Sequence, residues 1–114
     1  MNYNPDHAMN DSHAPSDSFA QLQRSATQAA ALLQAVGNPN RLLVLCLLIE
    51  HGEMSVGAIN EFVALSPSAL SQHLSRMRDE GLVAFRREAQ TLYYRIDHPH
   101  VATLVATLKD IFCP

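Results

Sequence analysis

Residues 66–78 read SPSALSQHLSRMR, and this stretch decides the fold. Ser66 is a favoured helix N-cap residue, and Pro67 suits the first helical position. Apolar residues at three- and four-residue spacing share one helix face, here Ala69 or Leu70, Leu74 and Met77. Ser68, Ser71 and Gln72 fall on the other face. The stretch therefore predicts an amphipathic helix that exposes hydroxyl and amide groups.

A shorter helix is predicted immediately before this stretch, over residues 56–64. Ser55 suits its N-cap, and Ile59, Phe62 and Val63 supply an apolar side. Only Leu65 and Ser66 separate the two helices, which leaves room for a tight turn. Two short helices joined in this way form a helix-turn-helix unit.

The hydrophobic period changes after Gly81. Apolar and polar residues alternate over residues 83–87 and again over 91–96, which predicts two β-strands. The connection Glu88-Ala89-Gln90 is short and polar, so the strands form a hairpin. A hairpin that directly follows a helix-turn-helix unit indicates a wing.

Three outer helices are predicted over residues 18–36, 39–51 and about 98–112, with Asn38 and Asp97 as N-caps of the last two. The second is apolar nearly all round, which predicts burial on several sides. The fold class is mainly α (α+β): a winged helix-turn-helix of about five helices and a two-stranded hairpin. The apolar stripes of the first and last helices exceed what one small domain covers, so we expect a homodimer.

The chain of 114 residues is long enough for one domain. Residues 1–17 lack apolar periodicity and predict a disordered N-terminal tail, which leaves residues 18–114 as the winged helix-turn-helix and dimerisation domain. The sequence shows neither a membrane-spanning apolar run nor a signal-peptide pattern, so we expect a cytoplasmic protein without a membrane partner.

The charge distribution points to a localised basic surface. The net charge is −3, but residues 1–17 contribute three aspartates and no lysine or arginine. Residues 66–95 hold five arginines against three acidic residues. Such a surface can bind phosphate although the whole chain is acidic. The alternative is a solvated helix and hairpin with no DNA role, as in a winged-helix module that binds protein.

Several motifs together resemble the ArsR/SmtB family of bacterial repressors. They are LQAVGNPNRLLVL at 33–45, SVGAI at 55–59, LSPSALSQHL at 65–74, LVAFRRE at 82–88 and QTLYY at 90–94. The resemblance covers about residues 18–114 and implies a dimeric winged helix that binds double-stranded operator DNA. No nucleophile–base set, paired carboxylates or phosphate-binding loop can be assigned, so we expect no enzyme activity.

The expected DNA contacts lie on the helix and on the wing. Gln72 can pair with adenine, and the arginines can neutralise phosphates. By resemblance, His73 also belongs to the DNA-reading segment. The full expected set is Ser66, Ser68, Ser71, Gln72, His73, Arg76, Arg78, Arg86, Arg87, Gln90 and Thr91.

The metal sites that the family resemblance implies are not matched. Ser55-Val56-Gly57 stands where the arsenic-sensing type has Cys-Val-Cys. His98 and His100 stand early in the last helix, but no later histidine completes a zinc-sensing set. We therefore expect no metal and no cofactor. A metal-responsive regulator remains an alternative, and a tail site using His7 and His13 stays open.

Two cysteines remain, Cys46 in the second helix and Cys113 at the end of the last. On spacing alone they could be a small buried residue and an incidental thiol. The pair resembles that of the BigR/SqrR/HlyU-type subgroup, which responds to sulfide and persulfide. That resemblance implies a redox switch in which a disulfide or polysulfide bridge forms on exposure to reactive sulfur species or oxidants. The sequence does not separate these two signals.

Overall fold

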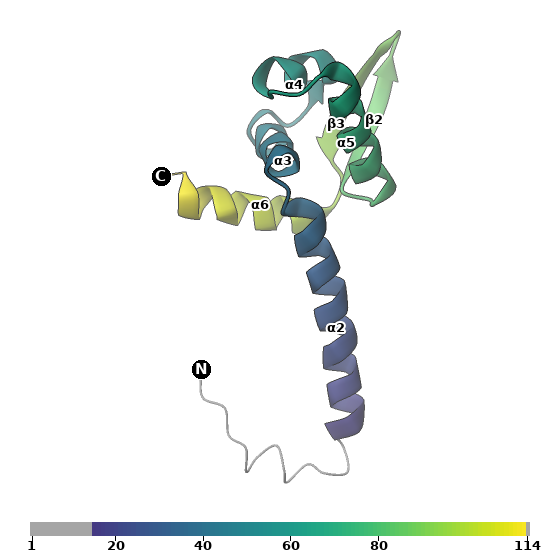
Figure 1. The fold of residues 1–114 in the computed structure, drawn as a ribbon, viewed down its shortest axis with the longest axis vertical. Coiled ribbons are helices and arrows are strands. Elements are labelled where there is room, and N and C mark those ends of the chain that lie inside the picture. The colour runs from purple at the N-terminus through teal and green to yellow at the C-terminus, as the bar shows by residue number, and fades with distance from the viewer. Residues whose placement is uncertain (1–14, 114) are drawn as a thin grey trace. The chain divides into compact units, whose positions relative to one another are not determined.

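The computed structural model describes residues 15–113 (Figure 1). These residues fall into two units, residues 15–34 and residues 35–113. Residues 1–14, most of the predicted tail, lie outside the described residues, as does Pro114. Helix α2 (Pro15–Val36) starts three residues before the expected Ser18. It accounts for the described part of the first unit.

The second unit contains the remaining elements in the predicted order. They are α3 (Pro39–His51), β1 (Met54–Ser55), α4 (Val56–Phe62), α5 (Pro67–Asp79), β2 (Val83–Glu88), β3 (Thr91–Ile96) and α6 (Pro99–Phe112). The described residues therefore form five helices and a small sheet, as the winged helix-turn-helix prediction required.

Side-chain caps explain where the helices begin. Asn38 Oδ1 accepts hydrogen bonds from the backbone N–H groups of Asn40 and Arg41, at 2.9 and 3.1 Å. Ser55 and Ser66 cap α4 and α5 in the same way, as predicted. The predicted cap Asp97 is wrong: His98 caps α6, with its Nδ1 accepting from Val101 N–H at 3.3 Å. Pro99 at the first helical position keeps the preceding residue extended, so that residue becomes the cap.

The sheet has three antiparallel strands in the order β1-β3-β2, one more than the predicted hairpin. In β2 and β3, Val83 pairs with Ile96 and Glu88 pairs with Thr91, so a two-residue turn closes the wing. Ala89 in that turn has a φ of 56°. The extra strand, β1, pairs Met54 with Tyr94 and Ser55 with Tyr93. A two-residue strand is too short for its alternation to be recognised in the sequence.

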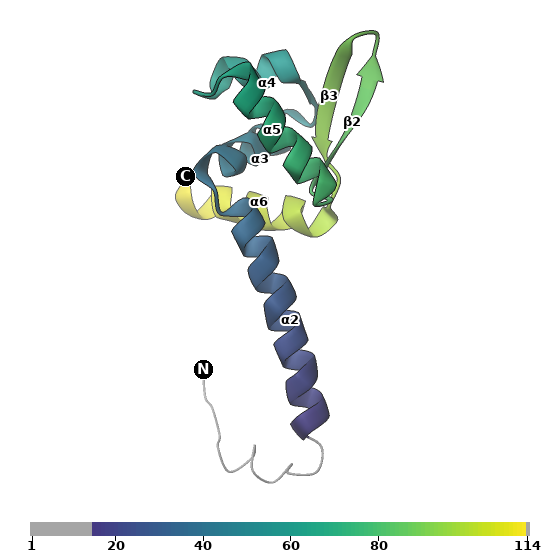
Figure 2. The ribbon, with the colours of Figure 1, turned by 45° about the vertical axis from the view of Figure 1, so that its right-hand side comes forward.

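The core of the second unit lies between α3, the helix-turn-helix pair, the base of the wing and α6. Its most completely buried side chains are Val44, Leu45, Leu48, Ile59, Leu70, Leu74, Met77, Leu82, Val83, Val101 and Val105. Figures 1 and 2 show α3 against α6, with the β2–β3 hairpin projecting away from α6. Helix α4 ends at Phe62, before the predicted Ala64, because Val63 is extended and turns into the core.

Among the described residues, no single helix is both long and apolar enough to cross a membrane, and α2 and α3 satisfy such a test only as a bent pair, by length and composition.

Candidate nucleic-acid interface

Helix α5 has one buried and one polar face. Leu70, Leu74 and Met77 are at most 1% exposed, which confirms the predicted inner face. Ser71, Gln72, Ser75 and Arg76 line an open hollow of about 420 Å³ on the other side. Hydroxyl, amide and guanidinium groups of this kind match the edges of bases and the phosphates of a duplex.

Not every predicted residue on α5 lies free on that face. The Ser66 hydroxyl accepts from Ala69 N–H at 3.2 Å and lies 3.3 Å from the Ser68 hydroxyl, so capping occupies it. Arg78 Nη2 donates to Asp79 Oδ1 at 3.4 Å, and the guanidinium carbon of Arg78 lies 5.3 Å from the centre of the Phe85 ring. Arg78 thus reaches from α5 toward the base of the wing.

His73 is half-buried and faces α3. Arg41 Nε donates to its Nδ1 at 3.4 Å. The resemblance placed His73 in the DNA-reading segment, but the sequence pattern alone did not indicate that Arg41 would contact it. The sequence marked Arg41 only as part of the motif LQAVGNPNRLLVL, and this motif was the available signal that Arg41 belongs to the site.

The two wing arginines have different surroundings. Glu53 accepts three hydrogen-bond contacts of 2.9–3.1 Å from Arg86, and Glu88 accepts one at 2.7 Å. These bonds, first that to Glu53 and then that to Glu88, raise the pKa of Arg86 above its usual value. The guanidinium also stacks 4.4 Å from the centre of the Tyr93 ring. Arg87 is exposed and forms no ion pair within residues 15–113.

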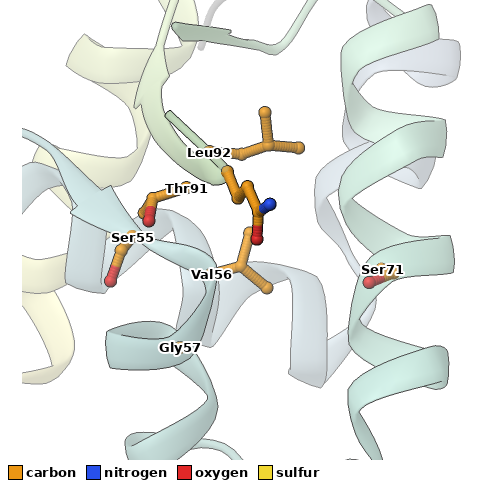
Figure 3. A pocket seen from close by; sticks show the side chains of 7 residues that line it. Ser55, Val56, Gly57, Ser71, Thr91 and Leu92 are labelled. Carbon is orange, nitrogen blue, oxygen red and sulfur yellow. The ribbon is translucent and has the colours of Figure 1, made fainter. Parts of the chain in front are cut away.

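An open hollow of about 500 Å³ separates the wing from α5 (Figure 3). Ser55, Val56 and Gly57 line it from the start of α4, Ser71 from α5, and Gln90, Thr91 and Leu92 from the wing. Figure 3 shows Ser71 across from Val56 and Thr91. A DNA strand that separates a major groove from the next minor groove must pass between a helix and a wing that enter those grooves. The hollow is therefore a candidate site for a DNA strand.

The two cysteines lie at α3 and at the end of α6, two helices that pack together. Cys46 is half-buried and Cys113 is exposed, and both thiols are free. The pKa of Cys46 is raised, mainly by burial of its thiol; the charge of Lys109 acts in the opposite direction, and Cys113 and Glu50 add to the increase. Lys109 Nζ also lies 3.7 Å from Glu50 Oε2, across the same two helices.

Within residues 15–113, no three His, Cys, Asp or Glu side chains are grouped so that they could hold a metal ion. His98 is used as a helix cap, and its ring centre lies 5.7 Å from that of His100.

Comparison with known proteins agrees with this architecture. The family model "Bacterial regulatory protein, arsR family" matches residues 38–84. The HTH-type transcriptional regulator YgaV of Escherichia coli is 52% identical over 96 residues, covering 84% of this chain and 97% of that protein. The transcriptional activator HlyU of Vibrio cholerae is 39% identical over 93 residues, covering 82% and 85%.

Solved structures show the same fold. Reduced HlyU from Vibrio cholerae has a TM-score of 0.78 at 38% identity, covering 82% of this chain and 98% of that one. The transcriptional repressor BigR from Xylella fastidiosa has a TM-score of 0.74 at 35% identity, covering 83% and 96%. The chain therefore belongs to the arsR family of bacterial regulatory proteins, which are winged helix-turn-helix transcriptional regulators and not enzymes.

Proposed function

We propose that this chain is a cytoplasmic repressor that binds operator DNA as a homodimer and is switched by a bridge between Cys46 and Cys113. The observation that carries the switch is the packing of α3, which holds Cys46, against α6, whose C-cap is Cys113, with Glu50 and Lys109 3.7 Å apart across the same two helices. The signal is a reactive sulfur species or another oxidant. The similarity to the transcriptional regulators HlyU and BigR supports the DNA-binding part of this proposal.

DNA binding uses the polar face of α5 and the tip of the wing. Gln72 and the nearby serines read base edges in the major groove, while Arg76 and Arg87 neutralise phosphates. Gln90 and Thr91 approach the neighbouring minor groove. In a two-fold symmetric dimer the two recognition helices would enter grooves about 34 Å apart, one turn of the duplex.

The dimer explains apolar side chains that the single chain leaves uncovered. On α2, Phe19, Leu22 and Leu33 are more than half exposed and recur at helical spacing. On α6, Ile111 and Phe112 are 62% and 74% exposed. Large apolar surfaces of this kind mark association sites in soluble proteins. Cys113 follows Phe112 directly, so a bridge that fixes Cys113 to α3 acts at the proposed interface.

The exposed thiol of Cys113 reacts first. Its thiolate attacks one sulfur of an organic disulfide RS–SR, forming Cys113–S–SR and releasing RS⁻. Cys46 then loses its proton and attacks the Cys113 sulfur, which forms the Cys46–Cys113 bond and releases the second RS⁻. Two cysteine thiols are oxidised, and one disulfide is reduced to two thiols. With an organic trisulfide RS–S–SR, the Cys113 thiolate attacks the central sulfur and releases RS⁻, which forms Cys113–S–S–SR. The Cys46 thiolate then attacks that same central sulfur and releases the second RS⁻, so one sulfur atom stays between the two cysteines.

The bridge would tie α3 to the C-terminal end of α6 and so restrain the proposed interface. A coupling of about 1–3 kcal/mol between bridge and operator would change DNA affinity about 5- to 150-fold. No large rearrangement is required for an effect of this size.

The test uses a duplex that the reduced wild-type protein selects from a random-sequence library. Affinity is measured before and after treatment with glutathione trisulfide, and intact mass reports added sulfur and lost hydrogens. We expect a large affinity change in the wild type and none in Cys46→Ser or Cys113→Ser. Unchanged wild-type affinity after complete bridging would refute the switch. Failure to select any duplex would refute the DNA-binding function itself.

A further inference from the structure

Arg41 lies behind the recognition helix and is unusually buried for an arginine, with its side chain 11% exposed. Its Nε donates to His73 Nδ1 at 3.4 Å. Its Nη1 donates to Glu80 Oε1 at 3.2 Å and to the carbonyl oxygen of Ala35 at 3.3 Å. One side chain at the start of α3 thus contacts both the middle and the end of α5.

The bond to His73 determines which ring nitrogen carries a proton. An arginine side chain has only donors and stays charged, so Nδ1 of His73 must be the acceptor. In a neutral imidazole the other nitrogen then carries the hydrogen. Arg41 therefore selects the tautomer in which His73 presents an Nε2–H donor.

His73 also lines a small hollow beside α5. Arg41, Gln72, His73 and Arg76 line a space of about 170 Å³. Gln72 and Arg76 also line the larger hollow on the outer face of α5, so the two spaces adjoin. Among the described residues, the lining consists of two guanidinium groups, an amide and an imidazole, and the Glu80 carboxylate pairs with one of these guanidinium groups, that of Arg41. This donor set suits an anion with several oxygens.

We propose that this hollow receives one phosphate of the operator backbone and that Arg41 is a positioning residue for it. His73 Nε2–H, Gln72 and Arg76 donate to the phosphate, and Arg41 acts through His73. This inference rests on the proposed DNA binding and gives His73 a backbone contact in place of a base contact. Arg41 itself is occupied, since Glu80 offsets its charge and three of its contacts are internal.

The first test examines the tautomer directly. The ring ¹⁵N chemical shifts of His73 in the full-length protein distinguish Nε2–H from Nδ1–H at a pH where the ring is neutral. We expect a single Nε2–H form in the wild type. In the double variant Arg41→Gln/Glu80→Gln, which keeps the local net charge, we expect a mixture. A wild-type Nδ1–H form would overturn the proposal, and this measurement needs no variant to fold and no DNA.

The second test measures how salt affects binding to a duplex selected from a random-sequence library. Arg76→Gln should weaken binding and lower the slope of log affinity against log salt by about one, because one phosphate contact is lost. Arg41→Gln/Glu80→Gln should weaken binding about three- to tenfold, as expected for one lost hydrogen bond, without changing that slope. A fall of about one in its slope would mean that Arg41 touches the phosphate itself, against the proposal.

The third test asks whether Arg41 acts through His73. His73→Gln supplies an amide donor near the Nε2 position without any tautomer to select. In that background the Arg41→Gln/Glu80→Gln substitutions should cost little further affinity, while His73→Asn, whose amide reaches only the Nδ1 position, should bind weakly. Equal losses in the wild-type and His73→Gln backgrounds would contradict the proposal. If the wild type selects no duplex, the proposed function fails instead, and the tautomer measurement still stands.

Discussion

The carboxylate of Glu53 holds the guanidinium of Arg86 by contacts of 2.9–3.1 Å, so the first basic residue of the wing is tied to the segment that precedes β1. Glu88 supplies a second carboxylate at 2.7 Å. The wing therefore offers less positive charge to DNA than its Arg86-Arg87 sequence suggests.

Releasing Arg86 should strengthen DNA binding. Glu53→Gln removes a negative charge and frees the guanidinium for a phosphate, so the salt slope of binding should steepen by up to about one. Glu88→Gln is the matched control for removing a charge from the wing while leaving Glu53 in place, and its effect should be smaller. Filter binding across a salt series measures both, and a Glu53→Gln slope equal to that of the wild type would contradict the expectation.

Gln72 should contribute sequence specificity and little general affinity. Gln72→Ala should reduce the preference for the selected duplex over a scrambled one by about 1–3 kcal/mol, the value of one bidentate base contact. Binding to the scrambled duplex should barely change. Ser75→Ala, on the same face of α5, is the control. A parallel loss on both duplexes would assign Gln72 to the phosphates instead.

The rate of bridge closure should rise with pH. Because burial raises the pKa of Cys46, its thiol stays protonated at neutral pH, and the attacking thiolate becomes more abundant as pH increases toward that raised pKa. Lys109→Met removes the charge that lowers this pKa and should slow closure, whereas Glu50→Gln removes a charge that raises it and should accelerate closure. Stopped-flow measurement of the loss of free thiol across about pH 6–9.5, a range around the usual thiol pKa, gives the closure rate of each protein. We expect the rate to increase from Lys109→Met through the wild type to Glu50→Gln, and identical rates in the two variants would refute this ranking.

The same shift predicts a stability change in alkali. A thiol whose pKa is raised by folding keeps its proton longer in the folded state than in the unfolded chain. Its stabilising contribution is therefore complete below the unfolded pKa and disappears as pH rises through the folded pKa. Urea unfolding at a series of alkaline pH values should show a smaller decline for Cys46→Ala than for the wild type.

The Asn38 cap should contribute about 0.5–2 kcal/mol to the free energy of unfolding. Asn38→Ala removes the acceptor for two backbone N–H groups at the start of α3. Asn40→Ala, two residues later, leaves the cap in place and should cost less. The difference in unfolding free energy between these variants isolates the cap, and equal costs would argue against it.

A charge on the exposed face of α2 should break the proposed dimer. Leu22 is 63% exposed and lies about three turns of helix from Leu33 on one side. Leu22→Glu should therefore yield monomers in sedimentation equilibrium and weaken operator binding. Gln28→Glu adds the same charge elsewhere on α2 and should leave the dimer intact. A dimeric Leu22→Glu protein would exclude this face from the interface.

Periodicity and capping residues were enough to predict most of the fold. Pro67 and Pro39 each follow a capping side chain, and both helices begin there. The same logic, applied to Asp97, failed because the proline stands two residues later and His98 takes the cap. The two-residue strand β1 was missed since its pairing with Tyr93 and Tyr94 is a tertiary contact without a local pattern.

The site residues were less predictable than the fold. The outer face of α5 follows from helical spacing, so the exposure of Ser71 and Gln72 could be derived. The partners of Arg86 and His73 come from 33 and 32 residues away in the sequence, and single-sequence patterns carry no information on such contacts. Charge counting treated all arginines alike, although Glu53 neutralises one of them.

The short strand β1 has a mechanical consequence. Ser55 pairs with Tyr93 of the wing and at the same time caps α4. The wing is therefore attached to the helix-turn-helix unit through its first residue. Tilting the wing would move Ser55, and α4 would then either move with it or lose the hydrogen bond from Ala58 N–H to the Ser55 hydroxyl. In the proposed dimer, a bridge between Cys46 and Cys113 would therefore act on the wing and α4 together, by changing the spacing or angle between the two DNA-reading units.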